Sequence, residues 1–207
     1  MTTILHVSCS PRGEASESYR LSRNIIGHLR RLRPEAVVVD RAIGGVGLAP
    51  IDADYAISQQ SSADVSRTGS MALSDELVQE LENADVVVIS TPMHNLTLPA
   101  VLKAWIDHVV RARRTFNMTP AGKVGALRDR PVFIAIASGG RFSGERARQP
   151  DFLTPYLRTI LASIGLRDLT FFSVQGTGAG PEAVAETRAR TDEALKEHFM
   201  RLAPGVL

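Results

Sequence analysis

Short apolar segments alternate with helical patterns along this chain, and that alternation constrains the fold more than any other feature. The segments, rich in β-branched residues, are TILHVS (3–8), AVVVD (36–40), DVVVIS (85–90), PVFIAIAS (131–138) and the weaker LTFFSV (169–174). The second to fourth are almost continuous in valine, isoleucine and alanine. Such runs are typical of strands that are covered on both faces of a sheet.

Between these segments, apolar residues recur at helical spacing. The pattern predicts helices over residues 16–33, 73–84, 98–112, 154–165 and 180–203. Ser74 is the expected N-cap of the second helix, and a proline near the start of each of the last three supports those boundaries. Residues 41–72 and 113–130 show little periodicity and are expected to be loops.

Strands that alternate with helices predict parallel pairing through right-handed crossovers. We therefore expect an α/β fold: a flavodoxin-like, doubly wound, five-stranded parallel sheet in the order 2-1-3-4-5, with helices on both faces. No repeat or linker divides the sequence, so a single domain is expected over residues 1–207. Ligands of such sheets bind outside the carboxyl ends of the strands, which directs attention to the turns after residues 8, 90 and 138.

The composition narrows the partners of the chain. Hydrophobic residues make up 44% and charged residues 22% of the 207 positions, and the net charge is only +2, which argues against a nucleic-acid partner. The N-terminus lacks the features of a signal peptide and no apolar run reaches the length of a membrane helix. A cytoplasmic protein without a membrane partner is expected. The five histidines show no spacing typical of metal ligands, and no metal site is predicted.

The turn after the first strand, SCSPRGEASESY (8–19), is rich in hydroxyl side chains and leads into a helix. Unpaired amides at a helix N-terminus favour an anion and serine hydroxyls add donors, so this turn predicts a site for a phosphate monoester. The alternative is that Ser16 only caps the helix. The glycine and lysine patterns of dinucleotide-binding and Walker A loops are absent, and Ala15 stands where a phosphatase loop built on Cys9 needs arginine.

The turn after the third strand, TPMHN (91–95), contains no glycine. Pro92 favours an extended backbone before it, so residues 93–96 are expected to expose successive backbone groups at the strand tip. Such an edge suits hydrogen bonds to a flat ring, and the Asn95 side chain can both donate and accept. We therefore expect this turn to hold a planar group and the first turn to hold a phosphate.

Several motifs together resemble one family. The segment PMHNLTLPAVLKAWID (92–107) is similar to the P-M-Y-N-F-x-x-P-x-x-L-K-x-x-x-D signature of the FMN-dependent NADH:azoreductase and quinone reductase family. The third turn, ASGGRFSG (137–144), resembles the flavin loop of that family, and DFLTPYLRTILASIGLRD (151–168) resembles a further segment. The serines of the first turn match its phosphate-binding serines, so the resemblance spans residues 3 to about 183.

This resemblance implies an enzyme that binds one FMN per subunit, accepts electrons from NADH and passes both to a quinone or azo compound in a ping-pong cycle. It also implies a homodimer with active sites at the subunit boundary. The implied cofactor-binding residues are Ser10, Ser16, Glu17, Ser18, Met93, His94, Asn95, Leu96, Ser138, Gly139, Gly140 and Arg141. Glu17 is expected to offer its amide and to point its carboxylate away from the phosphate.

Two positions of the second turn depart from the family pattern, because His94 replaces its usual tyrosine and Leu96 its usual phenylalanine. Imidazole groups exchange protons near neutral pH, which makes His94 a candidate catalytic residue as a proton donor. The alternative, which we favour, is that His94 only fills the place of the tyrosine beside the ring. Other functions share the fold: a flavodoxin-type electron carrier, an NADPH-dependent FMN reductase acting on metals or other acceptors, and a binding protein without activity.

Overall fold

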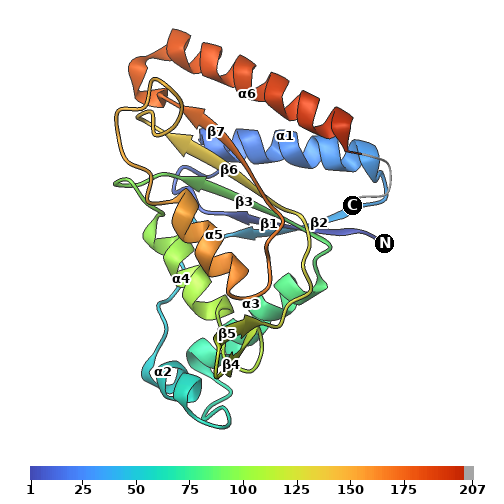
Figure 1. Cartoon of the computed structure of the whole chain (residues 1–207), viewed down its shortest axis with the longest axis vertical. Coiled ribbons are helices and arrows are strands. Elements are labelled where there is room, and N and C mark those ends of the chain that lie inside the picture. Colours follow the sequence, from blue (N-terminus) through green and yellow to red (C-terminus); the bar gives the residue numbers. More distant parts are fainter. Residues whose placement is uncertain (203–207) are drawn as a thin grey trace.

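The computed structural model describes residues 1–202, and a parallel sheet forms its centre (Figure 1). The strands lie in the order β2-β1-β3-β6-β7, and each neighbouring pair is parallel. Their bounds are β1 (Thr3–Ser8), β2 (Val37–Ala42), β3 (Val86–Pro92), β6 (Val132–Ser138) and β7 (Leu169–Gln175). The predicted order 2-1-3-4-5 is confirmed, because β6 and β7 are the fourth and fifth strands of this sheet.

Helices cover both faces of the sheet (Figure 1). One face carries α1 (Glu17–Leu32) and α6 (Pro181–Arg201), and the other carries α3 (Gly69–Asn83), α4 (Ala100–Val109) and α5 (Thr154–Ala162). Each helix predicted from apolar spacing is present. Residue 203, the last of the predicted C-terminal helix, lies outside the described residues.

Two apolar cores fill the space between the sheet and its helices. Successive side chains of a strand point to opposite faces. In β3, Val87 and Ile89 join the core beneath α3, α4 and α5, whereas Val86 and Val88 join the core beneath α1 and α6. The strand is therefore covered on both faces, which explains its continuous run of valine and isoleucine.

The edge strand β2 departs from the prediction for its sequence. The run AVVVD was expected to be covered on both faces, but Val37 and Val39 are 40% and 36% exposed. Only Val38 between them packs against a core. Composition does not distinguish an edge strand from a central one here, because topology alone decides whether a strand has one neighbour or two.

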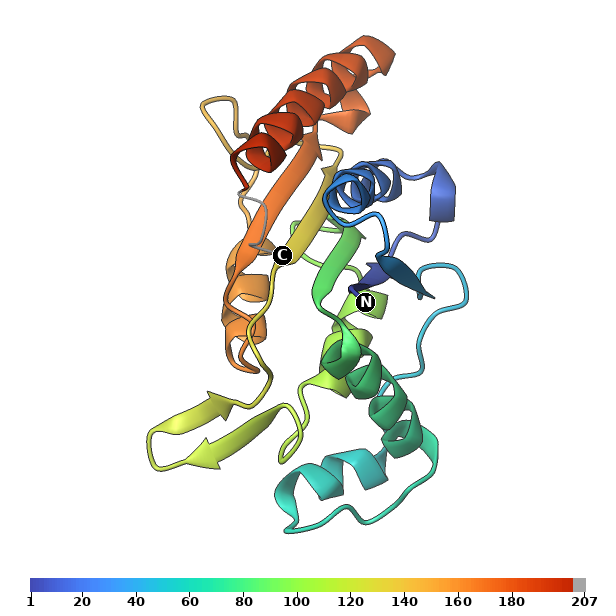
Figure 2. The same ribbon diagram turned by 90° about the vertical axis from the view of Figure 1, so that its right-hand side faces the viewer.

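Both segments expected to be loops contain regular structure, which Figure 2 shows at the end of the molecule away from α6. Residues 41–72 include α2 (Ala53–Gln60), and residues 113–130 include the antiparallel hairpin of β4 (Phe116–Thr119) and β5 (Gly122–Gly125). The Tyr55 hydroxyl donates to the carbonyl oxygen of Asp107 at 2.6 Å and fastens α2 to α4. These elements are too short to show a clear period in sequence, and distant contacts hold them.

Helix α3 begins earlier than its apolar pattern predicts. It starts at Gly69 with Thr68 as its N-cap, so the predicted cap Ser74 lies inside the helix. The buried Ser74 hydroxyl donates to the carbonyl oxygen of His108 at 2.6 Å and ties α3 to the end of α4. A serine that joins two helices has the same sequence appearance as a cap, because both uses depend on a short hydroxyl side chain.

The carboxyl ends of β1, β3, β6 and β7 gather at one edge of the sheet, on the left in Figure 1. Short 3-10 turns follow the first and the last of these strands, at Gly13–Ala15 and Thr177–Ala179. The turns that follow the strands therefore lie together, as the parallel topology predicts. The single domain predicted over residues 1–207 stays a prediction, and residues 203–207 lie outside the described part of the chain.

Candidate active site

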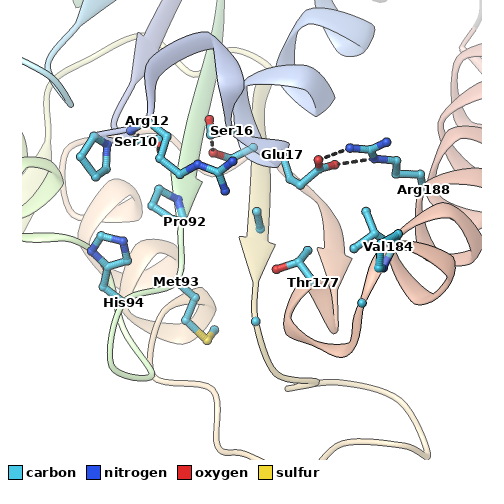
Figure 3. Close-up of a pocket in the computed structure, with 16 residues that line it drawn as sticks. Ser10, Arg12, Ser16, Glu17, Pro92, Met93, His94, Thr177, Val184 and Arg188 are labelled. Atoms are coloured by element: carbon cyan, nitrogen blue, oxygen red, sulfur yellow. Dashed lines mark hydrogen bonds and ion pairs between the residues drawn. The ribbon is translucent and has the colours of Figure 1, made fainter.

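A cavity of about 600 Å³ opens at the carboxyl edge of the sheet (Figure 3). Its volume lies within the range of pockets that bury small molecules and cofactors. It is lined by Ser10, Pro11, Arg12, Ser16, Glu17, Ser18, Pro92, Met93, His94, Ala137, Gly139, Thr177, Gly180, Pro181, Val184 and Arg188. Four strand ends and the start of α6 thus contribute to one site.

The N-terminus of α1 forms one wall of the cavity, and part of its hydrogen-bonding capacity is already used. The Ser16 hydroxyl accepts from the Tyr19 amide at 3.3 Å and donates to the Gly13 carbonyl oxygen at 2.8 Å. The Ser16 amide donates to the same carbonyl oxygen at 3.1 Å. Since the first amides of a helix have no partner within it, those of Glu17 and Ser18 are left for a ligand. Ser16 is thus the N-cap, and the next two residues supply the donors.

Other groups make this wall suitable for an anion. Arg12 extends toward the middle of the site in Figure 3, and no ion pair involves its guanidinium within residues 1–202. The Ser10 hydroxyl accepts from the Arg12 amide at 3.2 Å and shapes the turn. The buried Ser18 hydroxyl lies 3.4 Å from that of Ser16. All the residues predicted to hold a phosphate therefore line the same cavity.

The carboxylate of Glu17 points toward α6 (Figure 3). Arg188 donates its Nε–H to Glu17 Oε2 at 2.8 Å and its Nη2–H to Oε1, while Arg20 Nε lies 3.4 Å from Oε2. The hydrogen bonds from Arg188 are the main reason that the pKa of Glu17 is lowered from its ordinary value. This arrangement agrees with the expectation that Glu17 offers its amide and not its carboxylate.

The second turn has a tighter backbone than its sequence predicts. The Met93 amide donates to the Ala137 carbonyl oxygen at 2.8 Å, and His94 and Thr97 exchange two backbone hydrogen bonds of 2.9 and 3.0 Å. Asn95 and Leu96 have φ angles of +48° and +72°, as a two-residue turn of type I′ requires. The expectation that residues 93–96 expose successive backbone groups fails for the Met93 amide, which donates to β6, and for the amide and carbonyl oxygen of His94, which pair within the hairpin.

Met93 and His94 line the cavity, whereas Asn95 and Leu96 are not among the residues that line it. Their positive φ angles place them at the tip of the hairpin turn. The Leu96 carbonyl oxygen accepts from the Phe152 amide at 3.1 Å, so the tip is fastened to the segment that precedes α5. These two residues therefore set the shape of the turn that carries Met93 and His94.

The residues of the third turn, 138–141, do not all line the cavity. Gly139 lines the cavity, and the space where its side chain would stand is open. Ser138 is buried and its hydroxyl accepts from Gln149 Nε2 at 3.2 Å. A Cβ at Gly140 would lie 2.0 Å from Gln149 Oε1, so only glycine fits there without a shift. Arg141 lines a separate cavity of about 330 Å³ and not the main one.

The segment after β7 supplies lining residues that the sequence predictions missed. Thr177, Gly180, Val184 and Arg188 come from the turn after the fifth strand and from the first turns of α6. A signal was present, because GTGAGP (176–181) is rich in glycine and follows a strand that ends at the same edge. That edge rule applies to the fifth strand as it does to the others.

The described residues also bear on a thiol nucleophile, a metal site and a membrane span. Cys9 is fully buried, and burial raises the pKa of its thiol, so it is not an exposed nucleophile. Across residues 1–202, no cluster of three or more histidine, cysteine, aspartate or glutamate side chains is placed to hold a metal ion. No helix in that same range is long and apolar enough to span a membrane.

Comparison with known proteins agrees with this geometry. The family described as having a flavodoxin-like fold matches residues 2–199. An FMN-dependent NADH:quinone oxidoreductase of Pseudomonas fluorescens is 46% identical over 94% of this chain and 92% of its own. Another, of Burkholderia lata, is 45% identical over 92% of this chain and 93% of its own. The chain belongs to the family of these FMN-dependent NADH:quinone oxidoreductases.

Solved structures of related proteins have the same fold. An azoreductase from Bacillus anthracis superposes with a TM-score of 0.83 at 24% identity and covers 98% of this chain and 100% of its own. An FMN-dependent NADH-azoreductase from the same species, solved in complex with FMN, superposes with a TM-score of 0.77 at 22% identity, covering 96% of this chain and 99% of its own. At these identities, the likeness demonstrates the fold alone.

Proposed function

We propose that this chain is an FMN-dependent NADH:quinone oxidoreductase that also reduces azo compounds and binds one FMN per subunit. The observation that carries the proposal is the division of one cavity into two ends. The end at α1 offers the free amides of Glu17 and Ser18, and the other end is formed by the turns after β3 and β6. A phosphate ester joined to a flat ring matches this division, and curated relatives of this chain bear the corresponding name.

The residues present fit FMN. The amides of Glu17 and Ser18, with the Ser10 hydroxyl, would hold the phosphate, while Met93 and Gly139 would border the ring. When bound, FMN supplies the two-electron redox chemistry that links NADH to a quinone. The chain itself binds and orients the cofactor, and the fully buried Cys9 beneath the first turn offers no competing thiol.

His94 is exposed and lines the same cavity. Its amide and carbonyl oxygen are held by Thr97, so its backbone position is well defined. We propose that His94 borders the ring, in place of the tyrosine in the family motif that this segment resembles, and is not required as a proton donor.

We also propose that the protein acts as a homodimer. A groove of about 430 Å³ lies between α2, α4, α5 and the β4–β5 hairpin, and it is lined partly by exposed apolar side chains. Among them, Ile51 is 38% and Met118 is 69% exposed. Apolar surface of this kind is typical of a protein–protein interface, and a second copy of the chain is the proposed occupant.

One set of measurements on the purified protein tests these proposals. Reconstitution with FMN is expected to give a bound flavin spectrum, which NADH bleaches without oxygen and a quinone restores. Failure to bind FMN would refute the proposal, and a flavin that neither NADH nor NADPH reduces would indicate an electron carrier. The pH profile of quinone reduction by His94→Phe is expected to match that of the wild type, and sedimentation equilibrium is expected to give a dimer mass.

A further inference from the structure

An acidic residue occupies the wall of the cavity that is proposed to bind a phosphate. Glu17 is the first residue of α1, and its amide is one of the two left free for a ligand. Its carboxylate belongs to the same residue, so its negative charge lies close to any anion that this amide binds. Because the side chain is only 17% exposed, water screens the resulting repulsion incompletely.

Arg188 is the group that controls this charge. It reaches Glu17 from α6 with two N–H groups, one at 2.8 Å, in the paired geometry that suits a carboxylate. The other cation near Glu17 is Arg20, whose Nε lies at 3.4 Å and whose Nη1 pairs with Asp192 at 3.1 Å. Arg20 is therefore shared between two acids, whereas the hydrogen bonds of Arg188 go to Glu17.

We propose that Arg188 is a positioning residue for phosphate recognition and thereby for the choice of FMN over riboflavin. By pairing with Glu17, it neutralises the carboxylate and holds it toward α6, which leaves the Glu17 and Ser18 amides free to donate to a phosphate ester. This inference rests on the proposed function, because it assigns a role within the same site.

A purely structural role for Arg188, fastening α6 to α1, makes a different prediction. The two helices are also joined by Asp192, which accepts from Arg20 Nη1 and from Asn24 Nδ2 at 3.0 Å. Loss of Arg188 is therefore compatible with a folded protein. If Arg188 only joined the two helices, its loss would change the affinity for FMN and for riboflavin alike. If Arg188 neutralises Glu17 beside the phosphate, its loss changes the affinity for FMN alone.

The test is a titration of the apoprotein with FMN and with riboflavin, followed by flavin fluorescence at low ionic strength. In Arg188→Gln, we expect FMN affinity to fall about tenfold or more, and riboflavin affinity to stay within about twofold of wild type. In the double variant Glu17→Gln/Arg188→Gln, no charge remains to be neutralised, and we expect most of the FMN affinity to return. The control Arg190→Gln removes an arginine two residues away on the same helix and is expected to change neither affinity.

The possible outcomes separate this inference from the proposed function. A wild-type protein that does not bind FMN overturns both. If the wild type binds FMN, equal losses for the two flavins in Arg188→Gln overturn the inference alone. So does a double variant that binds FMN as weakly as the single one. Thermal unfolding of each variant, measured without flavin, identifies any loss that comes from a weakened α1–α6 contact.

Discussion

Each end of the cavity is formed by turns that follow strands, yet the two ends differ in the free backbone groups that they present to a ligand. At the first turn, the cap formed by Ser16 leaves the amides of Glu17 and Ser18 free. At the turn after β3, the amide of Met93 and both backbone groups of His94 are used within the protein. One end therefore offers hydrogen-bond donors, and the other offers a surface of defined shape.

The difference follows from the secondary structure that each turn enters. The first amides of a helix have no partner within the helix, whatever its sequence. A turn that leads into a helix therefore has N–H groups that are free to bind a ligand. In a two-residue hairpin turn, the two residues that flank the turn form backbone hydrogen bonds with each other. Their N–H and C=O groups are therefore not free to bind a ligand. Changes at the first turn should accordingly act on phosphate recognition, and changes at the second should act on the geometry that both flavins share.

The largest expected effect is the loss of one amide at the phosphate end. Glu17→Pro removes the N–H at the first position of α1, where proline suits a helix, and Ser16 already has the extended backbone (ψ 148°) that a following proline needs. A hydrogen bond to a charged group contributes about 1.5–3 kcal/mol, so we expect FMN affinity to fall roughly 10- to 100-fold relative to Glu17→Gln. Isothermal titration of both variants with FMN measures the difference.

The matched variant Glu17→Gln loses the carboxylate but keeps the amide, so the comparison isolates the N–H group. Riboflavin, which has no phosphate, is expected to bind both variants equally. Equal FMN affinities in the two variants would contradict the role assigned to this amide.

A smaller effect is expected at the tip of the second turn. Asn95 has a φ of +48°, which asparagine and glycine tolerate and alanine does not. We expect Asn95→Ala to destabilise the protein by about 1 kcal/mol and to weaken FMN and riboflavin by the same factor, because both carry the ring. Asn95→Gly is the control and should be close to wild type. Chemical denaturation measures the change in stability, and titrations with FMN and riboflavin measure the two affinities. A loss of affinity confined to FMN would contradict the claim that this turn acts on the geometry that both flavins share.

The smallest effect concerns α6, which contributes to the phosphate end and not to the turn after β3. His28 on α1 stacks on Phe199 of α6 at 5.0 Å between ring centroids, and His198 packs edge-on against Phe133 at 5.9 Å. Burial lowers the pKa of both histidines from the ordinary value of 6.5. The folded protein thus binds protons less readily than the unfolded chain, and this contribution to stability is present above about pH 6.5 and declines below it.

Hydrogen exchange of the α6 amides reports on this pH dependence. Protection factors for α6 are expected to stay level from pH 8 to about pH 6.5 and to fall below that pH, while those of β3 change less. The decline should be shallower in His198→Gln, which has no group that titrates at that position. An equally steep decline in the variant would mean that His198 does not contribute.

Much of the fold could be predicted from the sequence because its helices and strands depend on local patterns. The strand runs and apolar helical stripes predict the elements, and the alternation predicts their order. The composition of β2 misled, because its valine run predicted burial on both faces, whereas Val37 and Val39 are exposed at the edge position that the predicted strand order already gave to this strand. The site was predicted best at the first turn, where a helix N-terminus has the same chemistry in every fold, and least well at residues 177–188.

The sequence by itself determined the strand and helix segments, the helix that starts after Ser16 and the serine-rich turn before it, because each depends on neighbours within a few residues. Tertiary structure decided which donors of that turn stay free and what faces Glu17. Arg188 lies 171 residues further along the chain, and only the packing of α6 against α1 brings its guanidinium to that carboxylate. Likewise, the Met93 amide is used because β3 lies beside β6 in the folded sheet.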